Sequence, residues 1–206
     1  MPAGFSRSFA RAVGGALWCL ALPAVASEAT APIEQLDAGL LQVMKAGKAA
    51  PFQQRFDVLA PLVARAIDLD AILEGGVGAS WTTLAPAQQQ TLKTAFQRYS
   101  VATYVAHFDA FGGERFELLP SAAGADPVVR VRIVPGKTGD EAHVLAYTMR
   151  QTTGGWKAID VKADGSISQV VAQQEEIRAL VKARGTAGLY QRLQQKTAEL
   201  SGGAVK

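Results

Sequence analysis

The spacing of apolar residues changes twice along this chain, which limits the folds that it can adopt. Over residues 32–111 apolar side chains recur every three or four positions, as in amphipathic helices. Over residues 115–162 they alternate with polar ones, as in strands with one buried face. Over residues 168–200 the helical spacing returns. The sequence therefore predicts an α+β fold in which several helices pack against one curved antiparallel sheet of about four strands.

The turn-forming residues divide these regions into individual elements. Helices are predicted over residues 32–48, 52–67, 86–111, 168–183 and 189–200, the last two separated by Gly185. Strands are predicted over residues 115–119, 128–134, 142–150 and 156–162, with a hairpin turn at 152–155. Between the second and third helices we expect a short turn at 70–73 and a glycine-rich loop at 75–78.

The N-terminus has the pattern of an export signal. Arg7 and Arg11 precede an apolar stretch, residues 12–22, and the small residues Ala24 and Ala26 form a small-x-small site. The stretch is about half as long as the roughly 20 residues that a membrane-spanning helix needs. We therefore expect residues 1–26 to be removed and residues 27–206 to form one exported, periplasmic domain.

The composition of the expected mature chain excludes several kinds of function. The two basic residues of the signal leave 19 Lys and Arg against 18 Asp and Glu, a net charge of +1. A nucleic-acid-binding surface needs a concentrated basic patch, so we expect no nucleic-acid partner. Cys19, the only cysteine, leaves with the signal. Motifs for a metal site, a nucleophile or a phosphate loop are absent from the sequence, so we expect no metal and no cofactor.

Two small sets of residues could support catalysis, and both have simpler explanations. His107 and His143 are the only imidazoles, one in a predicted helix and one at a strand start, and nothing in the sequence brings them together. The acidic set consists of Asp68, Asp70, Asp160 and Asp164. Asp68 and Asp70 are expected to cap a helix, and Asp164 to form a turn with Gly165. We therefore assign no catalytic residue.

The apolar side chains give the most specific candidate site. A helix over residues 86–111 would carry aromatic residues along one side, opposite alternating apolar residues of the strands. This arrangement is either a filled core or a half-filled space for an apolar ligand, and composition does not separate the two. The candidate pocket residues are Phe96, Tyr99, Tyr104, Phe108, Val131, Leu145, Tyr147, Ile159 and Val161.

Several segments favour the ligand-binding interpretation because their order and spacing resemble those of a known family. The segments are Phe56-Asp57-Val58-Leu59, Gly78-x-x-Trp81, Pro86-x-Gln88-Gln89, Tyr147-Thr148-Met149-Arg150 and Trp156-Lys157-Ala158-Ile159-Asp160-Val161. Together they resemble the MlaC/Ttg2 family, periplasmic lipid-carrying components of ABC transport systems. The resemblance covers about 150 residues, from near Pro51 to Leu200.

One segment departs from the family pattern. Family members tend to have Val-Ser-Leu-Val after the glycine that corresponds to Gly165, whereas this chain has Ser166-Ile167-Ser168 followed by Gln169-Val170. The sequence of this segment, together with Leu193-Gln194-Gln195-Lys196, is more similar to the sequences of the hopanoid-associated HpnM branch. The departure leaves two ligand classes open, a phospholipid and a hopanoid-type triterpenoid.

The resemblance implies a carrier and not an enzyme. Such a carrier would hold the hydrocarbon part of a membrane lipid at the nine candidate residues, act as a monomer and dock transiently on an inner-membrane transporter complex. Two alternatives remain. The fold that we expect is an NTF2-like cone with extra helices, and one alternative is a small ketosteroid-isomerase-like enzyme on a similar cone-shaped α+β fold. Such an enzyme would need a buried carboxylate or histidine with a shifted pKa. The other is a periplasmic adaptor that carries nothing.

Overall fold

The structure, a computed structural model, describes residues 22–122, 126–137, 139–165 and 168–205. Most of the expected signal, residues 1–21, lies outside this range. The elements are α1 (Leu22–Ala46), α2 (Phe52–Ala66), α3 (Leu69–Val77), α4 (Pro86–His107), β1 (Arg115–Ala122), β2 (Val128–Val134), β3 (His143–Thr152), β4 (Gly155–Ala163) and α5 (Gln169–Ser201), with short 3-10 helices at Gly47–Ala49 and Gly78–Thr83. The predicted α+β architecture, helices before and after a four-stranded sheet, is confirmed.

The sheet is an antiparallel meander in the order β1-β2-β3-β4. Val129 pairs with Tyr147 and Val131 with Leu145, so these side chains share one face. Val129, Val131 and Tyr147 are buried, whereas Arg130 on the opposite face is exposed. This confirms the prediction that one face of the sheet is buried and the other is exposed to solvent. We call the buried face, with Val129, Val131, Leu145, Tyr147 and Met149, the inner face of the sheet.

A β-bulge interrupts the alternation in β4. Thr148 pairs with Asp160 but Met149 pairs with Ala158, which leaves Ile159 without a cross-strand partner. As a result, Ala158 and Val161 both pair with residues of the inner face. The predicted strict alternation of inward and outward side chains along this strand is therefore wrong at Ile159.

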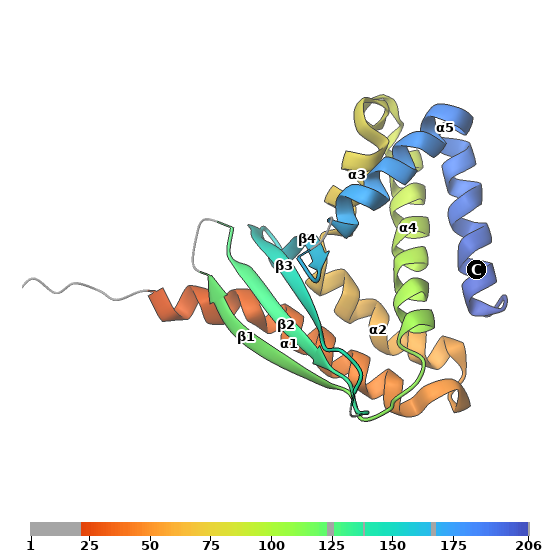
Figure 1. The fold of residues 1–206 in the computed structure, drawn as a ribbon. Helices are drawn as coiled ribbons and strands as arrows, with labels where there is room; N and C mark the ends of the chain where they lie inside the picture. Colours follow the sequence, from red (N-terminus) through yellow and green to blue (C-terminus); the bar gives the residue numbers. More distant parts are fainter. Residues whose placement is uncertain (1–21, 123–125, 138, 166–167, 206) are drawn as a thin grey trace, which may run out of the picture.

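The helices surround the inner face and one edge of the sheet. α1 runs along the sheet and contacts all four strands (Figure 1). The end of α2 and the segment that follows it close the β4 edge. The amide of Asp68, between α2 and α3, donates to the carbonyl oxygen of Ala158 at 2.9 Å, and Lys157 Nζ donates to the carbonyl oxygen of Ala64 at 2.9 Å. α4 packs chiefly against α2 and α5 rather than against the strands.

Residues 69–77 form a helix where we expected a short turn and a loop. Asp68 caps it, as predicted, by accepting a hydrogen bond from the amide of Ala71 at 3.2 Å. Asp70, the other predicted cap, instead forms an ion pair with Lys93 of α4, 2.9 Å long. Gly76, which reads as a loop residue, lies inside the helix because α3 and α5 meet there with no room for a side chain.

Two helix boundaries also differ from the prediction. α4 ends at His107 rather than near residue 111, and α1 begins at Leu22, before the expected cleavage point after Ala26. At Gly185 the backbone is non-helical, with φ of 65°, and divides α5 into two arms as expected. Of the helices in the described ranges, none combines the length and apolarity needed to cross a membrane.

Candidate functional site

One side of α4 faces the interior with a row of residues four positions apart. The row consists of Phe96, Ser100, Tyr104 and Phe108, which directly follows the last residue of the helix, and we call it the inner row of α4. The Tyr104 and Phe108 rings stack with centroids 6.2 Å apart. Phe108 also lies 6.3 Å from Phe116, so aromatic side chains bridge the distance from α4 to β1. Helical periodicity alone places these residues on one face.

The structure places the nine predicted pocket residues in or against the hydrophobic core. Phe96, Val131 and Tyr147 are at most 1% exposed. The half-buried residues that pack against the core are Tyr99, Tyr104, Phe108, Leu145 and Val161. Ile159 is the half-buried bulge residue. The most buried of the predicted pocket residues are therefore part of the packed core.

A buried carboxyl group, which sequence reasoning missed, lies in the same interior. Asp37 of α1 is 8% exposed, and within the described structure its Oδ1 atom has no hydrogen-bond partner. Burial, with a smaller contribution from Glu34, raises the pKa of Asp37 to about 7. The sequence does contain a signal for this burial, because Asp37 lies on the apolar stripe of α1 between Ile33 and Leu40.

Two phenols on other elements interact electrostatically with this carboxyl group. Burial and the charge of Asp37 raise the pKa of Tyr104 on α4 to about 12. Burial, Tyr104 and Asp37 raise the pKa of Tyr147 on β3 well above its ordinary value. α1, α4 and β3 thus each contribute one oxygen-bearing side chain to the apolar interior, and the three interact electrostatically. We call Asp37, Tyr104 and Tyr147 the oxygen cluster.

Other polar atoms of the interior also lack partners among the described residues. They are Ser100 Oγ of the inner row, Trp156 Nε1 of β4 and Arg55 Nε of α2. The Arg55 guanidinium does donate through another nitrogen to the carbonyl oxygen of Val105, at 3.2 Å. Native interiors leave few such atoms unpaired, so each one needs an explanation.

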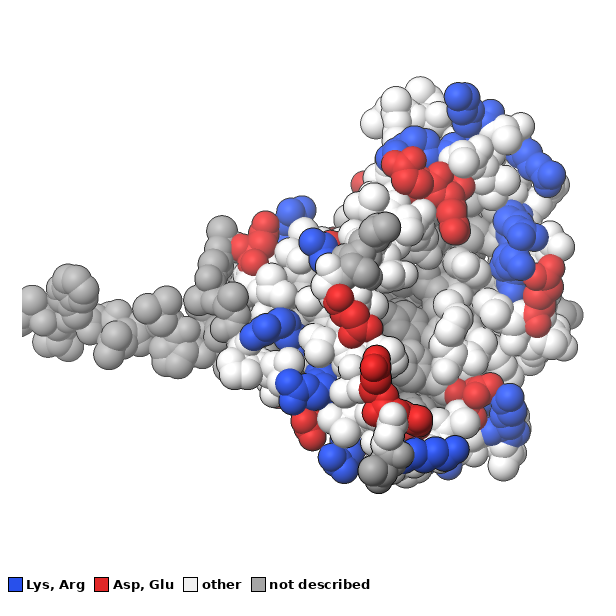
Figure 2. All heavy atoms as spheres, viewed as in Figure 1, with Lys and Arg blue, Asp and Glu red and all other residues white. Residues whose placement is uncertain are grey.

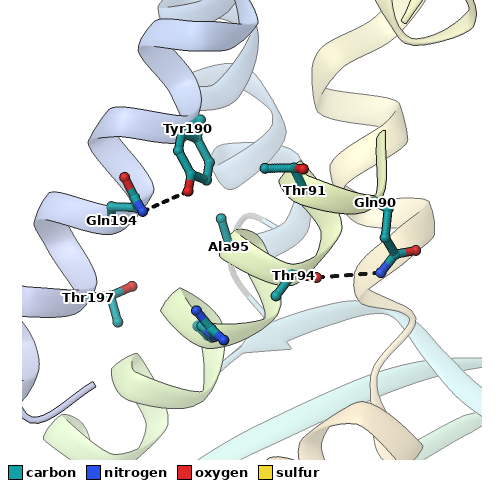
Figure 3. A pocket seen from close by; sticks show the side chains of 8 residues that line it. Gln90, Thr91, Thr94, Ala95, Tyr190, Gln194 and Thr197 are labelled. Atoms are coloured by element: carbon teal, nitrogen blue, oxygen red, sulfur yellow. Dashed lines mark hydrogen bonds between the residues drawn. The ribbon is translucent and has the colours of Figure 1, made fainter. Parts of the chain in front are cut away.

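Two cavities flank the contact between α4 and the second arm of α5. The smaller, about 70 Å³, has Phe96, Tyr99, Ile177 and Leu193 in its wall and so includes two predicted pocket residues. The larger, about 240 Å³, has a polar wall that none of the nine predicted residues joins (Figure 3). Its wall consists of Gln90, Thr91, Thr94, Ala95, Arg98, Tyr190, Gln194 and Thr197. Sequence patterns gave no sign of this cavity, because its wall forms only when α5 folds back on α4.

The histidines and the remaining acidic residues have structural partners. His143 Nδ1 lies 2.8 Å from Asp164 Oδ2, and both side chains are exposed. The amide of Val144 and His143 lower the pKa of Asp164. His107 Nδ1 lies 2.8 Å from the carbonyl oxygen of Thr103, and Asp160 accepts a hydrogen bond from the Ser168 hydroxyl. In the part of the chain that the structure describes, no cluster of His, Cys, Asp or Glu could hold a metal ion.

Charged groups of both signs are spread over the face of the molecule in Figure 2. Acidic and basic side chains alternate there rather than gather by sign, which agrees with the nearly neutral mature chain.

A solved structure has the same fold. The phospholipid-binding protein from Ralstonia solanacearum, determined in complex with a phospholipid, superposes with a TM-score of 0.70. The match covers 84% of this chain and 99% of that one, at 21% sequence identity. At this identity the likeness concerns the fold.

A comparison with protein families shows more than a shared fold. The model of the family described as MlaC protein matches residues 34–195, which is most of the chain and includes the inner row of α4 and the whole sheet. An isomerase-like enzyme would need a buried carboxylate with a shifted pKa, and Asp37 meets that single requirement, but the family is one of carriers. The protein therefore belongs to the MlaC family and is a lipid-binding carrier rather than an enzyme.

Proposed function

We propose that the mature chain carries a membrane phospholipid through the periplasm and holds its hydrocarbon part between the inner row of α4 and the inner face of the sheet. In water, each exposed CH₂ group of a lipid chain costs about 0.8 kcal/mol. A carrier lowers this cost by surrounding the chains with apolar side chains and leaving the head group outside. No cofactor is needed for that task.

The unpaired polar atoms of the interior are the observation that supports this location best. Asp37 Oδ1 and Ser100 Oγ lie inside an apolar core and have no partner among the described residues, an arrangement that is unfavourable in a permanently closed protein. A ligand or ordered water that enters with the lipid would satisfy them. The proposal is also supported by the phospholipid that the Ralstonia protein of the same fold binds.

The packing of α4 suggests how the interior opens. α4 rests on α2 and α5, whereas aromatic side chains such as Phe108 bridge from it to the sheet. Side chains can change rotamer at far lower cost than a helix can leave its partners. In our proposal, Tyr104 and Phe108 swing aside and the lipid chains take the space that they occupied.

The location and the partners belong to the same proposal. We infer that the chain is exported and cleaved after Ala26, acts as a monomer and docks briefly on an inner-membrane transporter complex. The signal-like N-terminus supports export. The mixed surface charge supports brief docking over tight electrostatic capture (Figure 2).

The test is native mass spectrometry of the exported protein, followed by solvent extraction and identification of the bound lipid. We expect the measured mass to equal that of residues 27–206 with one phospholipid bound. A bound hopanoid or squalene-like precursor would move the protein to the HpnM branch. A lipid-free mass that is unchanged after incubation with a membrane lipid extract would overturn the proposal in favour of an adaptor.

A further inference from the structure

The larger cavity between α4 and the second arm of α5 lies outside the proposed lipid site. Its volume is about 240 Å³, and none of the nine predicted pocket residues belongs to its wall. We propose that this cavity binds a small uncharged polyol, which is either a free saccharide or the polyol head group of a lipid. The inference does not depend on the proposed function, because the wall contains no residue of the lipid site.

Two small residues form the floor of the larger cavity, and longer side chains form its rim. Ala95 of α4 is 7% exposed and Thr197 of α5 is 2% exposed, and both belong to the wall. The rim includes the exposed side chains of Arg98 and Gln194. Ala95 and Tyr190 face each other across the space from α4 and α5 (Figure 3). The cavity is therefore open to solvent at the rim and closed at its floor.

Two hydroxyl groups of the wall have a proton to donate to a ligand. The Tyr190 hydroxyl accepts a hydrogen bond from Gln194 Nε2 at 2.7 Å. The Thr94 hydroxyl accepts one from Gln90 Nε2 at 3.4 Å. A hydroxyl that accepts a hydrogen bond keeps its own O–H group, and neither of these donates to another described residue. The wall therefore offers at least two O–H donors.

The same wall also offers hydrogen-bond acceptors. Thr197 Oγ1 donates its proton to the carbonyl oxygen of Leu193 at 2.8 Å, so it has only lone pairs left for a ligand. The amide groups of Gln90 and Gln194 donate in the bonds just described, but their oxygen atoms accept none within the described structure. Donors and acceptors thus lie in one wall. A ligand hydroxyl, which both donates and accepts, matches such a mixture.

The charge of the wall favours a neutral ligand over an ion. Among the described residues of the wall, Arg98 is the only charged one. A phosphate or carboxylate ligand only accepts hydrogen bonds, so the lone pairs of Thr197 and of the two amide oxygens would repel it. A divalent cation would find no carboxylate ligand in this wall. A polyol has neither disadvantage.

The size of the cavity limits the ligand to about one sugar ring. A volume of about 240 Å³ corresponds to about eight water molecules at roughly 30 Å³ each. Sites for drug-sized ligands are larger, roughly 300–1,000 Å³. The half-buried ring of Tyr190 adds an apolar surface, against which the C–H groups of a sugar ring can pack.

The test is an NMR titration of the isotope-labelled exported protein with myo-inositol and with methyl α-glucoside. We expect saturable shifts of the side-chain amide signals of Gln90 and Gln194, with a Kd on the order of 1 mM for a ligand of this size. Cyclohexanol, a ring with a single hydroxyl, and inorganic phosphate are the comparison ligands. Both should bind more weakly, because cyclohexanol lacks most of the hydrogen bonds and phosphate lacks donors for the amide oxygens.

Variants of the wall locate the polyol. Tyr190→Phe keeps the ring and removes the O–H donor, and Gln194→Ala removes an amide. Each should weaken polyol binding by about 3- to 10-fold, as the loss of a hydrogen bond does. Gln195→Ala is the matched control, because Gln195 is the next residue of α5 and is not part of the wall. It should leave the Kd unchanged, and circular dichroism establishes that each variant is folded.

Two short-chain lipids distinguish the sources of the polyol. If the ligand is a head group, phosphatidylinositol should shift the Gln90 and Gln194 signals and phosphatidylcholine should not. If the ligand is a free saccharide, neither lipid should shift them, and methyl α-glucoside should bind the lipid-loaded and the lipid-free protein equally. Either pattern supports a polyol site.

Three results would overturn the inference. The first is the absence of saturable shifts with both polyols, and the second is tighter binding of phosphate or cyclohexanol than of myo-inositol. The third is an unchanged Kd in both Tyr190→Phe and Gln194→Ala, which would place the polyol elsewhere. None of these results bears on the carrier function, and a protein that binds no lipid but binds myo-inositol in this cavity would overturn only the proposed function.

Discussion

Gly76 of α3 lies directly against Ile177 of α5, and a Cβ atom on Gly76 would stand 2.9 Å from the Cβ and Cγ2 atoms of Ile177. Real Cβ atoms do not approach other atoms so closely. We therefore expect Gly76→Ala to lower the free energy of unfolding by about 1–3 kcal/mol, as overpacking does, despite the better helix propensity of alanine. Urea denaturation followed by circular dichroism measures this change.

Gly75 provides the matched control for this prediction. The nearest atoms to a Cβ atom there belong to the flexible end of the Gln174 side chain, which can move away at the cost of its hydrogen bond to the carbonyl oxygen of Ile72. Because the better helix propensity of alanine offsets that loss, Gly75→Ala should change the free energy of unfolding much less than Gly76→Ala. Equal losses of stability in the two variants would show that helix propensity, and not the contact with Ile177, decides the effect.

Stability should depend on pH through Asp37. The folded protein keeps the Asp37 proton up to about pH 7, whereas the unfolded chain releases it near the ordinary pKa of 3.8. The folded state thus binds more protons between these values, and stability falls as the pH rises through this window, by on the order of 4 kcal/mol for this group. Asp37→Asn, which is neutral throughout, should flatten the curve and be the more stable protein at pH 8.

Denaturant titrations at pH 4, 6 and 8 measure this dependence. Asp57→Asn, which changes an exposed carboxyl group on α2, is the control and should follow the wild-type curve. Parallel curves for wild type and Asp37→Asn would mean that the Asp37 carboxylate finds a compensating partner.

A charge on the inner face of the sheet should prevent lipid binding. Leu145 and Val161 pack against the core but are only half-buried, so Leu145→Asp or Val161→Asp should leave a folded protein whose lipid site is polar. We expect neither variant to retain lipid in native mass spectrometry. Arg132→Ala, on the exposed face of β2, should retain it fully. Equal lipid content in all three variants would contradict the proposed location.

The kink of α5 should require glycine at position 185. Gly185 has φ of 65° and ψ of −178°, a region that is essentially restricted to glycine. A Cβ atom would meet open space, so the cost of Gly185→Ala is conformational, about 1–3 kcal/mol. Thermal melts measure it, and Ala187→Gly in the second arm tests whether helix propensity alone explains such losses.

The sequence predicted those parts of the fold that depend on local patterns. The four strands, the hairpin turn before Gly155 and the break at Gly185 all follow from periodicity and glycine position. α3 was missed because Gly75 and Gly76 read as loop residues, whereas close packing explains at least Gly76. The bulge at Ile159 was missed because it depends on the register with β3, which alternation within one strand does not contain.

The site was predictable only as an apolar face. Helical spacing placed Phe96, Tyr104 and Phe108 together, and alternation placed Val131, Leu145 and Tyr147 together. Asp37 was missed because a search for apolar stripes passes over a carboxyl group within the stripe. The electrostatic environment of Asp37 also includes Tyr104 and Tyr147, which lie far from it in the sequence and interact with it only in the folded protein.

The two arms of α5 bind different neighbours. The first arm, through Ile177, lies against Gly76 of α3, and the second, through Leu193, faces α4 across the smaller cavity. α3 is further tied to α4 by the ion pair between Asp70 and Lys93. Each of the three helices α3, α4 and α5 therefore contacts the other two. α4 therefore cannot move away from the sheet without disturbing its contacts with both α3 and α5, whereas the aromatic side chains between α4 and the sheet can change rotamer without breaking these contacts.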